Sequence, residues 1–259
     1  MNKLFQPVQV GSLTLKNSIV FAPTSVGREG LNFYEKIAKG GASLIILPDI
    51  SVIPSMLGAP SLGSLQYADY FRKVVEICHQ YDCKVSVQLF YPEYDVDYIG
   101  SLYRQRGKIS SDEVHRLLAE NMMGYADTLT TEQADAIVEK FAVAARNARE
   151  VGVDMIQIHG DRLIGSFSSA LFNHRTDRYA PHTAFAEAVV KAVRAAVPEM
   201  PLDYKLTIRT EEPKLGRGGA LISEVPEFVE VLEAAGVDAF HVAIANHSNI
   251  RDTIPAANH

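Results

Sequence analysis

The stretch LTTEQADAIVEKFAVAARNAREVGVDMIQIHG (residues 129–160) sets the fold class of this chain. Thr130 and Gln133 have the spacing of a capping box, and apolar residues at helical spacing follow them. These apolar positions are Ala134, Ile137, Val138, Phe141, Ala145 and Ala148. The pattern predicts a helix over Thr130–Val151, and the apolar run Met155–His159 predicts a strand buried on both faces. A helix that leads into such a strand is typical of parallel βαβ units.

The same alternation continues on both sides of this stretch. Further strands are expected at Ser18–Ala22, Leu44–Leu47, Lys84–Leu89, Asp203–Ile208 and Ala239–Ala243. Further helices are expected at Phe33–Lys39, Asp69–Tyr81 and Thr183–Val197, with one more that Ser223 caps and that runs to Ala235. Strands that alternate with helices form parallel sheets with right-handed crossovers. An open doubly wound sheet and a (β/α)8 barrel both fit this order, but no GxGxxG follows the first strand, which weakens the dinucleotide-binding alternative.

A closed barrel of this type has eight βα units, and the pattern supplies about six before the loop-like tail Ile254–His259. We therefore expect one C-terminally incomplete TIM-barrel-type domain over residues 1–259. Six strands would leave two open sheet edges, so a homo-oligomer or a partner chain that covers them is also expected.

The composition narrows the class of protein. A net charge of −6 argues against nucleic-acid and anionic-membrane partners, and no apolar run is long enough to span a bilayer. The N-terminal segment lacks the apolar core of a secretory signal. The two cysteines, Cys78 and Cys83, are too few for a disulfide framework or a zinc site, so we expect free thiols and a cytoplasmic location.

In a barrel, functional groups lie at the carboxyl ends of strands and in the loops that follow. These positions hold Pro23, Thr24, Asp49, Gln88, Tyr91, His159, Arg162, Lys205, Arg209, His241 and His247. The set lacks the carboxylate and histidine cluster of a metal site, and the chain has neither a GxSxG elbow nor a P-loop. A threonine, a glutamine amide, a histidine and a lysine are instead the groups that a planar heterocycle with alternating donors and acceptors would need.

Several motifs, in order, resemble the old yellow enzyme family of FMN-dependent NAD(P)H:flavin oxidoreductases and ene-reductases. They are LFQPVQVGSLTLKNSIVFAPT at the start, YEKIAKGGASLII, VSVQL, the 129–160 stretch and NHRTDRY. Together they cover essentially the whole chain. The resemblance implies a (β/α)8 barrel with FMN as cofactor and NAD(P)H as reductant.

The resemblance also implies roles for individual residues. Pro23 and Thr24 would lie under the flavin ring, Gln88 on its pyrimidine edge and Lys205 near N1. Asp49 falls where the family often has a small residue against the flavin, and a carboxylate would sit poorly beside a reduced, anionic ring. His159 would bind the oxygen of the substrate.

The chain departs from the family pattern at several of these positions. Arg162 holds the place of a second polar residue that usually partners the histidine, and Ile164 holds the place of a tyrosine proton donor. The family's H-x-G-R after the glutamine is replaced by Tyr91, Glu93 and Tyr94. We expect His159, Arg162 and Tyr91 to be the catalytic set, with Tyr91 as a displaced proton donor. The strands that grip the FMN phosphate in the family lie beyond the six-unit pattern.

Structural roles are the alternative for each of these residues. Gln88 and His159 can satisfy core hydrogen bonds, Thr24 can serve a turn, and Lys205 can extend its ammonium to solvent. Tyrosines in the loop after the third strand can simply pack over the barrel mouth. Arg175 and Asp177 are expected to form an ion pair that fixes a loop, and His241 and His247 are left as structural.

Two functions remain open from the sequence. The first is hydride transfer from a reduced flavin to an activated C=C bond of an enone or enoyl small molecule, with solvent or a loop tyrosine as proton source. The second is a binding or assembly subunit that has lost its chemistry and carries no flavin. A third reading treats the chain as one portion of a longer enzyme.

Overall fold

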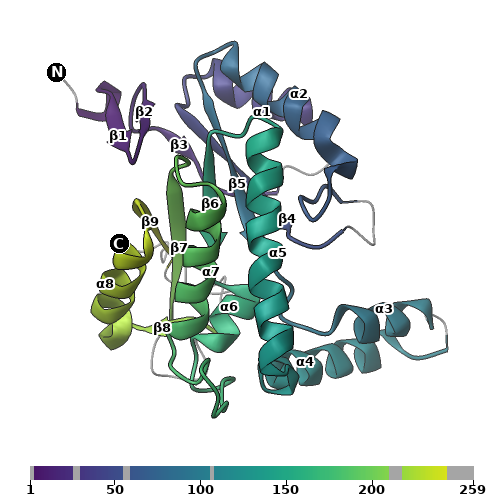
Figure 1. Cartoon of the computed structure of the whole chain (residues 1–259). Helices are drawn as coiled ribbons and strands as arrows, with labels where there is room; N and C mark the ends of the chain where they lie inside the picture. The colour runs from purple at the N-terminus through teal and green to yellow at the C-terminus, as the bar shows by residue number, and fades with distance from the viewer. Residues whose placement is uncertain (1–2, 26–29, 55–58, 106–107, 210–217, 244–259) are drawn as a thin grey trace, which may run out of the picture.

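The structure is a computed structural model that describes residues 3–25, 30–54, 59–105, 108–209 and 218–243. Its centre is a curled sheet of parallel strands in the order β3-β4-β5-β6-β7-β9, with the short β8 paired to the end of β7 (Figure 1). The strands are β3 (Val20–Phe21), β4 (Leu44–Ser51), β5 (Lys84–Phe90), β6 (Met155–His159), β7 (Leu202–Arg209), β8 (Ala220–Leu221) and β9 (Ala239–Ala243). The predicted half-barrel of six parallel strands is thus confirmed.

The helices are α1 (Leu31–Lys39), α2 (Ala68–His79), α3 (Val96–Arg104), α4 (Ser111–Thr128), α5 (Thr131–Glu150), α6 (Arg162–Phe167), α7 (Ala184–Ala196) and α8 (Val225–Ala235). Helices α1, α2, α5, α7 and α8 cover the convex side of the sheet, whereas α3 and α4 project away from it (Figure 1). Helices α5 and α7 pack side by side (Figure 1). Short 3-10 turns lie at Lys3–Phe5, Leu65–Tyr67 and Ile222–Glu224. In the described ranges, no helix combines the length and the apolar character needed to cross a bilayer.

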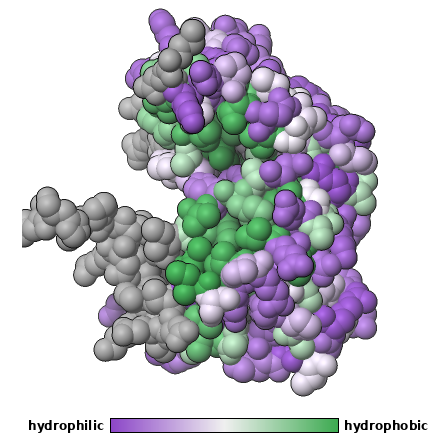
Figure 2. Space-filling model, turned by 90° about the vertical axis from the view of Figure 1, so that its left-hand side faces the viewer, coloured by the Kyte–Doolittle hydropathy of each residue, from purple (hydrophilic) through white to green (hydrophobic). Residues whose placement is uncertain are grey.

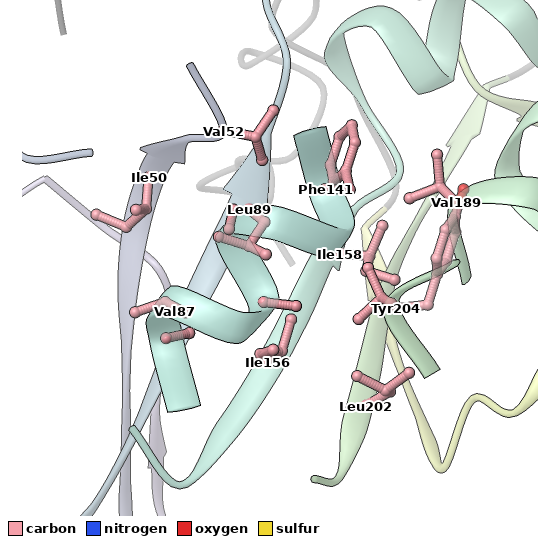
Figure 3. Packing of buried hydrophobic residues seen from close by; sticks show 14 of the residues in the cluster. Ile50, Val52, Val87, Leu89, Phe141, Ile156, Ile158, Val189, Leu202 and Tyr204 are labelled. Atoms are coloured by element: carbon pink, nitrogen blue, oxygen red, sulfur yellow. The ribbon is translucent and has the colours of Figure 1, made fainter. Parts of the chain in front are cut away.

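The capping box at the start of α5 forms as predicted. The Thr130 hydroxyl accepts a bond from the backbone N–H of Gln133, and the Gln133 side chain accepts one from the backbone N–H of Thr130. The predicted apolar face is buried, with Phe141 fully enclosed against the sheet. Alternate strand residues meet this layer, among them Val87, Leu89, Ile156 and Ile158 (Figure 3). This interface between helices and sheet forms the main core.

The other face of the sheet is concave and carries the remaining strand positions. Near the amino ends of the strands it forms an apolar groove of about 270 Å³, closed on one side by the hairpin of β1 (Val8–Val10) and β2 (Leu13–Leu15). Figure 2 shows apolar residues gathered in a hollow on this side of the molecule. Asp203 and His241 are the polar members of the groove lining. Towards the carboxyl ends of the strands, the concave face becomes polar.

Three local predictions were wrong, and one element was not predicted. Strand β4 does not stop at Leu47 but continues to Ser51 past Pro48, with a register shift between Leu47 and Ile50. The segment after β5 is not an extended loop but contains α3 and leads to α4. Ser223 does not cap α8, because the 3-10 turn Ile222–Glu224 precedes the helix and Glu224 occupies the N-cap position. The hairpin of β1 and β2 was not expected at all.

The two cysteines are free and buried, as predicted. Cys78 lies in the last turn of α2 and Cys83 directly precedes β5. The backbone N–H of Cys83 donates to the carbonyl of Cys78, which closes the turn between these elements. Both thiols therefore serve as small apolar groups in the core.

Candidate functional site

The site is built at the carboxyl ends of β4, β5, β6 and β7, and it begins with Asp49. This residue has a left-handed backbone with φ of 48°, within the register shift of β4. Non-glycine residues rarely adopt such a conformation, and it is concentrated at functional sites. Here it turns the carboxylate of Asp49 towards His159, at the end of β6, and Arg162, at the start of α6.

His159, the last residue of β6, is buried with 2% of its surface exposed. Burial lowers the pKa of its imidazole to about 3. The negative charge of Asp161 opposes this change and the positive charge of Lys205 adds to it, so the ring is neutral at physiological pH. The backbone N–H of Asp161 donates to Nδ1 over 3.4 Å, which leaves the ring proton on Nε2. Nε2 lies 3.7 Å from the nearer Asp49 carboxylate oxygen. The neutral ring therefore offers one N–H donor to the mouth of the site.

Arg162 is clamped between two carboxylates. Its guanidinium donates to Glu93 over 3.3 Å and to Asp49 over 3.2 Å, and it lies 5.6 Å from the centre of the Phe90 ring. Its backbone is left-handed, with φ of 57°. Burial raises the pKa of Glu93 more than the charge of Arg162 lowers it. The cation thus ties the β4 bulge to the loop after β5 and neutralises the charge of Asp49.

Lys205 on β7 pairs in register with His159 on β6 and with His241 on β9. Burial lowers the pKa of its ammonium, and the charges of Asp161 and Asp49 oppose this. Gln88 is buried on β5, and its Oε1 accepts a long bond of 3.4 Å from the backbone N–H of Asp49. A cation, an amide oxygen and a neutral imidazole N–H therefore meet at one edge of the sheet.

The other predicted site residues are less closely tied to this group. Pro23 and Thr24 follow the end of β3, and Thr24 is exposed. Tyr91 packs against the core, and burial raises the pKa of its hydroxyl. His247 lies outside the described residues. Arg209 donates to the carbonyl of Gly219, which holds the end of β7 to β8.

The predicted ion pair of Arg175 and Asp177 is confirmed. The Arg175 guanidinium also donates to the carbonyls of Ala126 and Leu129, and Asp177 accepts from the hydroxyl of Thr131. These contacts fasten the loop after α6 to the turn between α4 and α5. The pair is structural and lies apart from His159 and its neighbours.

The sequence interpretation gave no functional role to Asp161, Glu93, Gln157 and Asp203. Gln157 and Asp203 are buried and form a hydrogen-bonded row with Gln88 across three strands. A signal for both was present, since each precedes a predicted site residue by two positions on the same strand and so shares its face. No cluster of three or more metal-ligating side chains occurs within the described ranges.

Comparisons with known proteins agree with this geometry. The family model for "NADH:flavin oxidoreductase / NADH oxidase family" matches residues 3–257. A bilirubin reductase from Mediterraneibacter gnavus is 39% identical over 98% of this chain and 41% of its own length. A bilirubin reductase from Clostridium symbiosum is also 39% identical, over 99% of this chain and 71% of its own. The chain thus spans less than half of one relative and about seven tenths of the other.

Solved structures share the fold. An old yellow enzyme from Pichia sp. AKU4542 superposes with a TM-score of 0.73 at 22% identity, over 93% of this chain and 70% of that one. A 2-naphthoyl-CoA reductase superposes with a TM-score of 0.75 at 17% identity, over 95% of this chain and 41% of that one. These similarities confirm the predicted TIM-barrel fold class.

Proposed function

Because the chain belongs to the NADH:flavin oxidoreductase / NADH oxidase family, we propose that it is an FMN-dependent NAD(P)H oxidoreductase that reduces an activated carbon–carbon double bond. One observation carries the proposal. The buried, neutral His159 presents its Nε2–H at the same sheet edge as Lys205 and the amide oxygen of Gln88. This is a site for a planar ring and for a polarised carbonyl beside it.

The residues present fit the ring of FMN. Lys205 supplies a half-buried cation for the ring edge near N1, Gln88 supplies an acceptor for a ring N–H, and Pro23 and Thr24 supply the surface under the ring. The Asp49 carboxylate does not exclude an anionic ring, because Arg162 is paired with it. When bound, the flavin supplies a hydride that originates from NAD(P)H.

His159 is proposed to hold the substrate carbonyl. In the structure its Nε2 lies 3.7 Å from the Asp49 carboxylate, which is too far for a hydrogen bond. The carbonyl oxygen of a ligand can approach the same N–H within hydrogen-bond distance. A donor aimed at that oxygen stabilises the negative charge that develops there as the β-carbon accepts hydride. We propose Arg162 as the residue that fixes Asp49 and holds an anionic group of the substrate, with Tyr91 or solvent as the proton source.

The substrate is proposed to be a conjugated carbonyl compound. Two relatives at 39% identity are named bilirubin reductases, and another, at 27% identity, is named a cinnamate reductase. Each of these names denotes a compound with a double bond conjugated to a carbonyl or carboxyl group. The relatives with reductase names do not favour the alternative of a flavin-free assembly subunit.

The test begins with the visible spectrum of purified protein and a titration with FMN. Flavin absorption bands, followed by anaerobic NAD(P)H oxidation that depends on an added enone or bilirubin, would support the proposal. A colourless protein that ignores added FMN would instead favour the flavin-free alternative, in which a second copy or a partner covers the edges at β3 and β9. Size-exclusion chromatography of the same sample would check that alternative.

Replacing Lys205 by methionine should weaken FMN binding and make the bound flavin harder to reduce. Methionine keeps the length of the stem and removes a cation that favours the anionic reduced ring. We expect about tenfold weaker binding and a midpoint potential lower by about 30 mV, which corresponds to about 1.4 kcal/mol for two electrons. Lys191→Met, on the exposed side of α7, is the matched control. An unchanged potential would place Lys205 outside the flavin site.

A further inference from the structure

A row of buried polar side chains crosses the concave face below the site. The strand registers set Gln88 on β5 beside Gln157 on β6, and Gln157 beside Asp203 on β7. The three side chains are at most 5% exposed. Gln88 Nε2 donates to Gln157 Oε1 over 2.6 Å, and Gln157 Nε2 donates to Asp203 Oδ2. The row therefore links the groove side of the sheet to the amide that faces the site.

The direction of these bonds is set from one end. An amide can turn its oxygen or its nitrogen to a neighbour, but an ionised carboxylate only accepts. Asp203 therefore binds the amide nitrogen of Gln157, so the amide oxygen of Gln157 points to Gln88. That oxygen in turn accepts the hydrogen bond from the amide nitrogen of Gln88. The Oε1 of Gln88 is left facing Asp49 at the site. His241 agrees with this order, because its Nδ1 lies 3.2 Å from the same Gln157 nitrogen and acts as an acceptor in the neutral ring.

We propose that Asp203 is a positioning residue that orients the Gln88 amide through Gln157, so that the site presents an acceptor and selects ligand edges that carry an N–H donor. The proposal rests on the proposed function for the identity of the ligand, a flavin ring. It does not rest on it for the orientation of the amides, which the ligand-free protein already possesses.

Because the direction of the row depends on the charge of Asp203, the orientation of the two amides should depend on pH. Burial raises the pKa of this carboxyl to about 6, although the hydrogen bond from Gln157 and the charge of Lys205 oppose the change. The titratable groups near it are Lys205 on its own strand and His241 on β9. Burial lowers the pKa of both of these side chains. A protonated Asp203 can donate as well as accept, and the fixed direction of the row is then lost.

The first arm of the test uses no ligand. Protein with ¹⁵N-labelled glutamine side chains is titrated by NMR between pH 7.5 and 5.0, and the amide signals are assigned by single substitutions. We expect the signals of Gln88 and Gln157 to move with one shared midpoint near the pKa of Asp203, and to stay still in Asp203→Asn. A Gln88 signal that stays still while that of Gln157 moves would overturn the proposal. Should the variant fail to fold, the titration of the unaltered protein decides alone.

The second arm measures binding of riboflavin, which has the ring but no phosphate to titrate. We expect binding to weaken about tenfold from pH 7.5 to 5.0, whereas Asp203→Asn is about tenfold weaker at pH 7.5 already and insensitive to pH. Ser86→Ala, at a buried position on β5 that lies outside the row, should behave like the parent. A variant that keeps the parental affinity and pH slope would contradict the proposal. Failure to bind either FMN or riboflavin at any pH would contradict the proposed function, while the amide titration still decides the orientation.

Discussion

Replacing His159 by alanine should lower the rate of enone reduction about 100- to 1000-fold while FMN affinity stays within about threefold of the parent. The imidazole is fully enclosed, and its single N–H is the donor that faces the mouth of the site. Removing it takes away the group that we propose to stabilise negative charge on the substrate oxygen. The measurement is single-turnover oxidation of the reduced, flavin-loaded protein by an enone, with no oxygen present.

A second readout separates binding from turnover. A para-substituted phenol presents an oxygen of the same kind without being reduced, and its affinity should fall about 10- to 100-fold, the value of a hydrogen bond to a charged oxygen. His174→Ala is the control, since His174 is exposed and pairs with Asp127 away from the site. Unchanged phenol affinity in His159→Ala would remove His159 from the site.

The pH dependence follows from the burial of the ring. Because the pKa of His159 is lowered to about 3, the ring stays neutral from pH 5 to pH 8 and contributes no inflection to the rate over this range. The unfolded chain binds a proton near pH 6.5, so burial of the neutral ring also makes the fold less stable as the pH drops below that value. An inflection near pH 6.5 that disappears in His159→Ala would show that the ring is more solvated than the structure indicates.

The sequence predicted the parts of the fold whose signals are local. The capping box of Thr130 and Gln133 and the apolar face behind it place α5 within one residue at each end. Strand β6 was predicted with both of its bounds correct, because a buried parallel strand reads as a short apolar run. The order of strands and helices then fixes the sheet, since parallel neighbours need crossovers of one hand.

The errors arose where a local rule was overridden. The predicted strand ended with its apolar run at Leu47, yet β4 continues past Pro48 through a register shift that needs no N–H at that position. Helix α4 was missed although Ser110 caps it by accepting from the N–H of Glu113, because few of its side chains are buried and its apolar pattern is weak. Helix α3 was missed as well, because its residues were interpreted as part of the loop after the third strand.

The site was only partly predictable for a different reason. A single residue at a strand end, such as His159, follows from the barrel rule, and Lys205 lies beside it in register although it is in the middle of β7. Their partners do not follow from it, because the pairing of Arg162 with Asp49 and Glu93 joins the end of β4 and the loop after β5 to the start of α6. Such contacts depend on the left-handed backbone conformations of Asp49 and Arg162, and no pattern of residue types in the sequence predicts these conformations.

Replacing Gly160 by alanine should destabilise the fold by about 3 kcal/mol and disturb the site at the same time. A Cβ at this position would lie 2.3 Å from the backbone carbonyl oxygen of Lys205 and 2.6 Å from the ring of Tyr204. Neither can move easily, because the carbonyl accepts a 3.0 Å bond from the Gly160 N–H and the ring is 1% exposed. For a chain of this size, the loss corresponds to a Tm lower by about 6–12 °C.

The control is a glycine with the opposite expectation. Gly124 lies within α4, and a Cβ there would meet no atom within 4 Å, so Gly124→Ala should stabilise the protein by about 0.5–1 kcal/mol through helix propensity. Thermal unfolding of both variants gives the sign of each change in stability, and phenol binding reports on the site.

The backbone N–H of Gly160, next to His159, donates to the carbonyl of Lys205 on the neighbouring strand. Relief of the clash must therefore move β6 away from β7 at the point where the side chains of His159 and Lys205 lie next to each other. Gly160→Ala should therefore weaken phenol binding even at temperatures where it is fully folded, and Gly124→Ala should not. A Gly160→Ala protein with parental Tm and parental phenol affinity would mean that the strand ends are not packed as the structure shows.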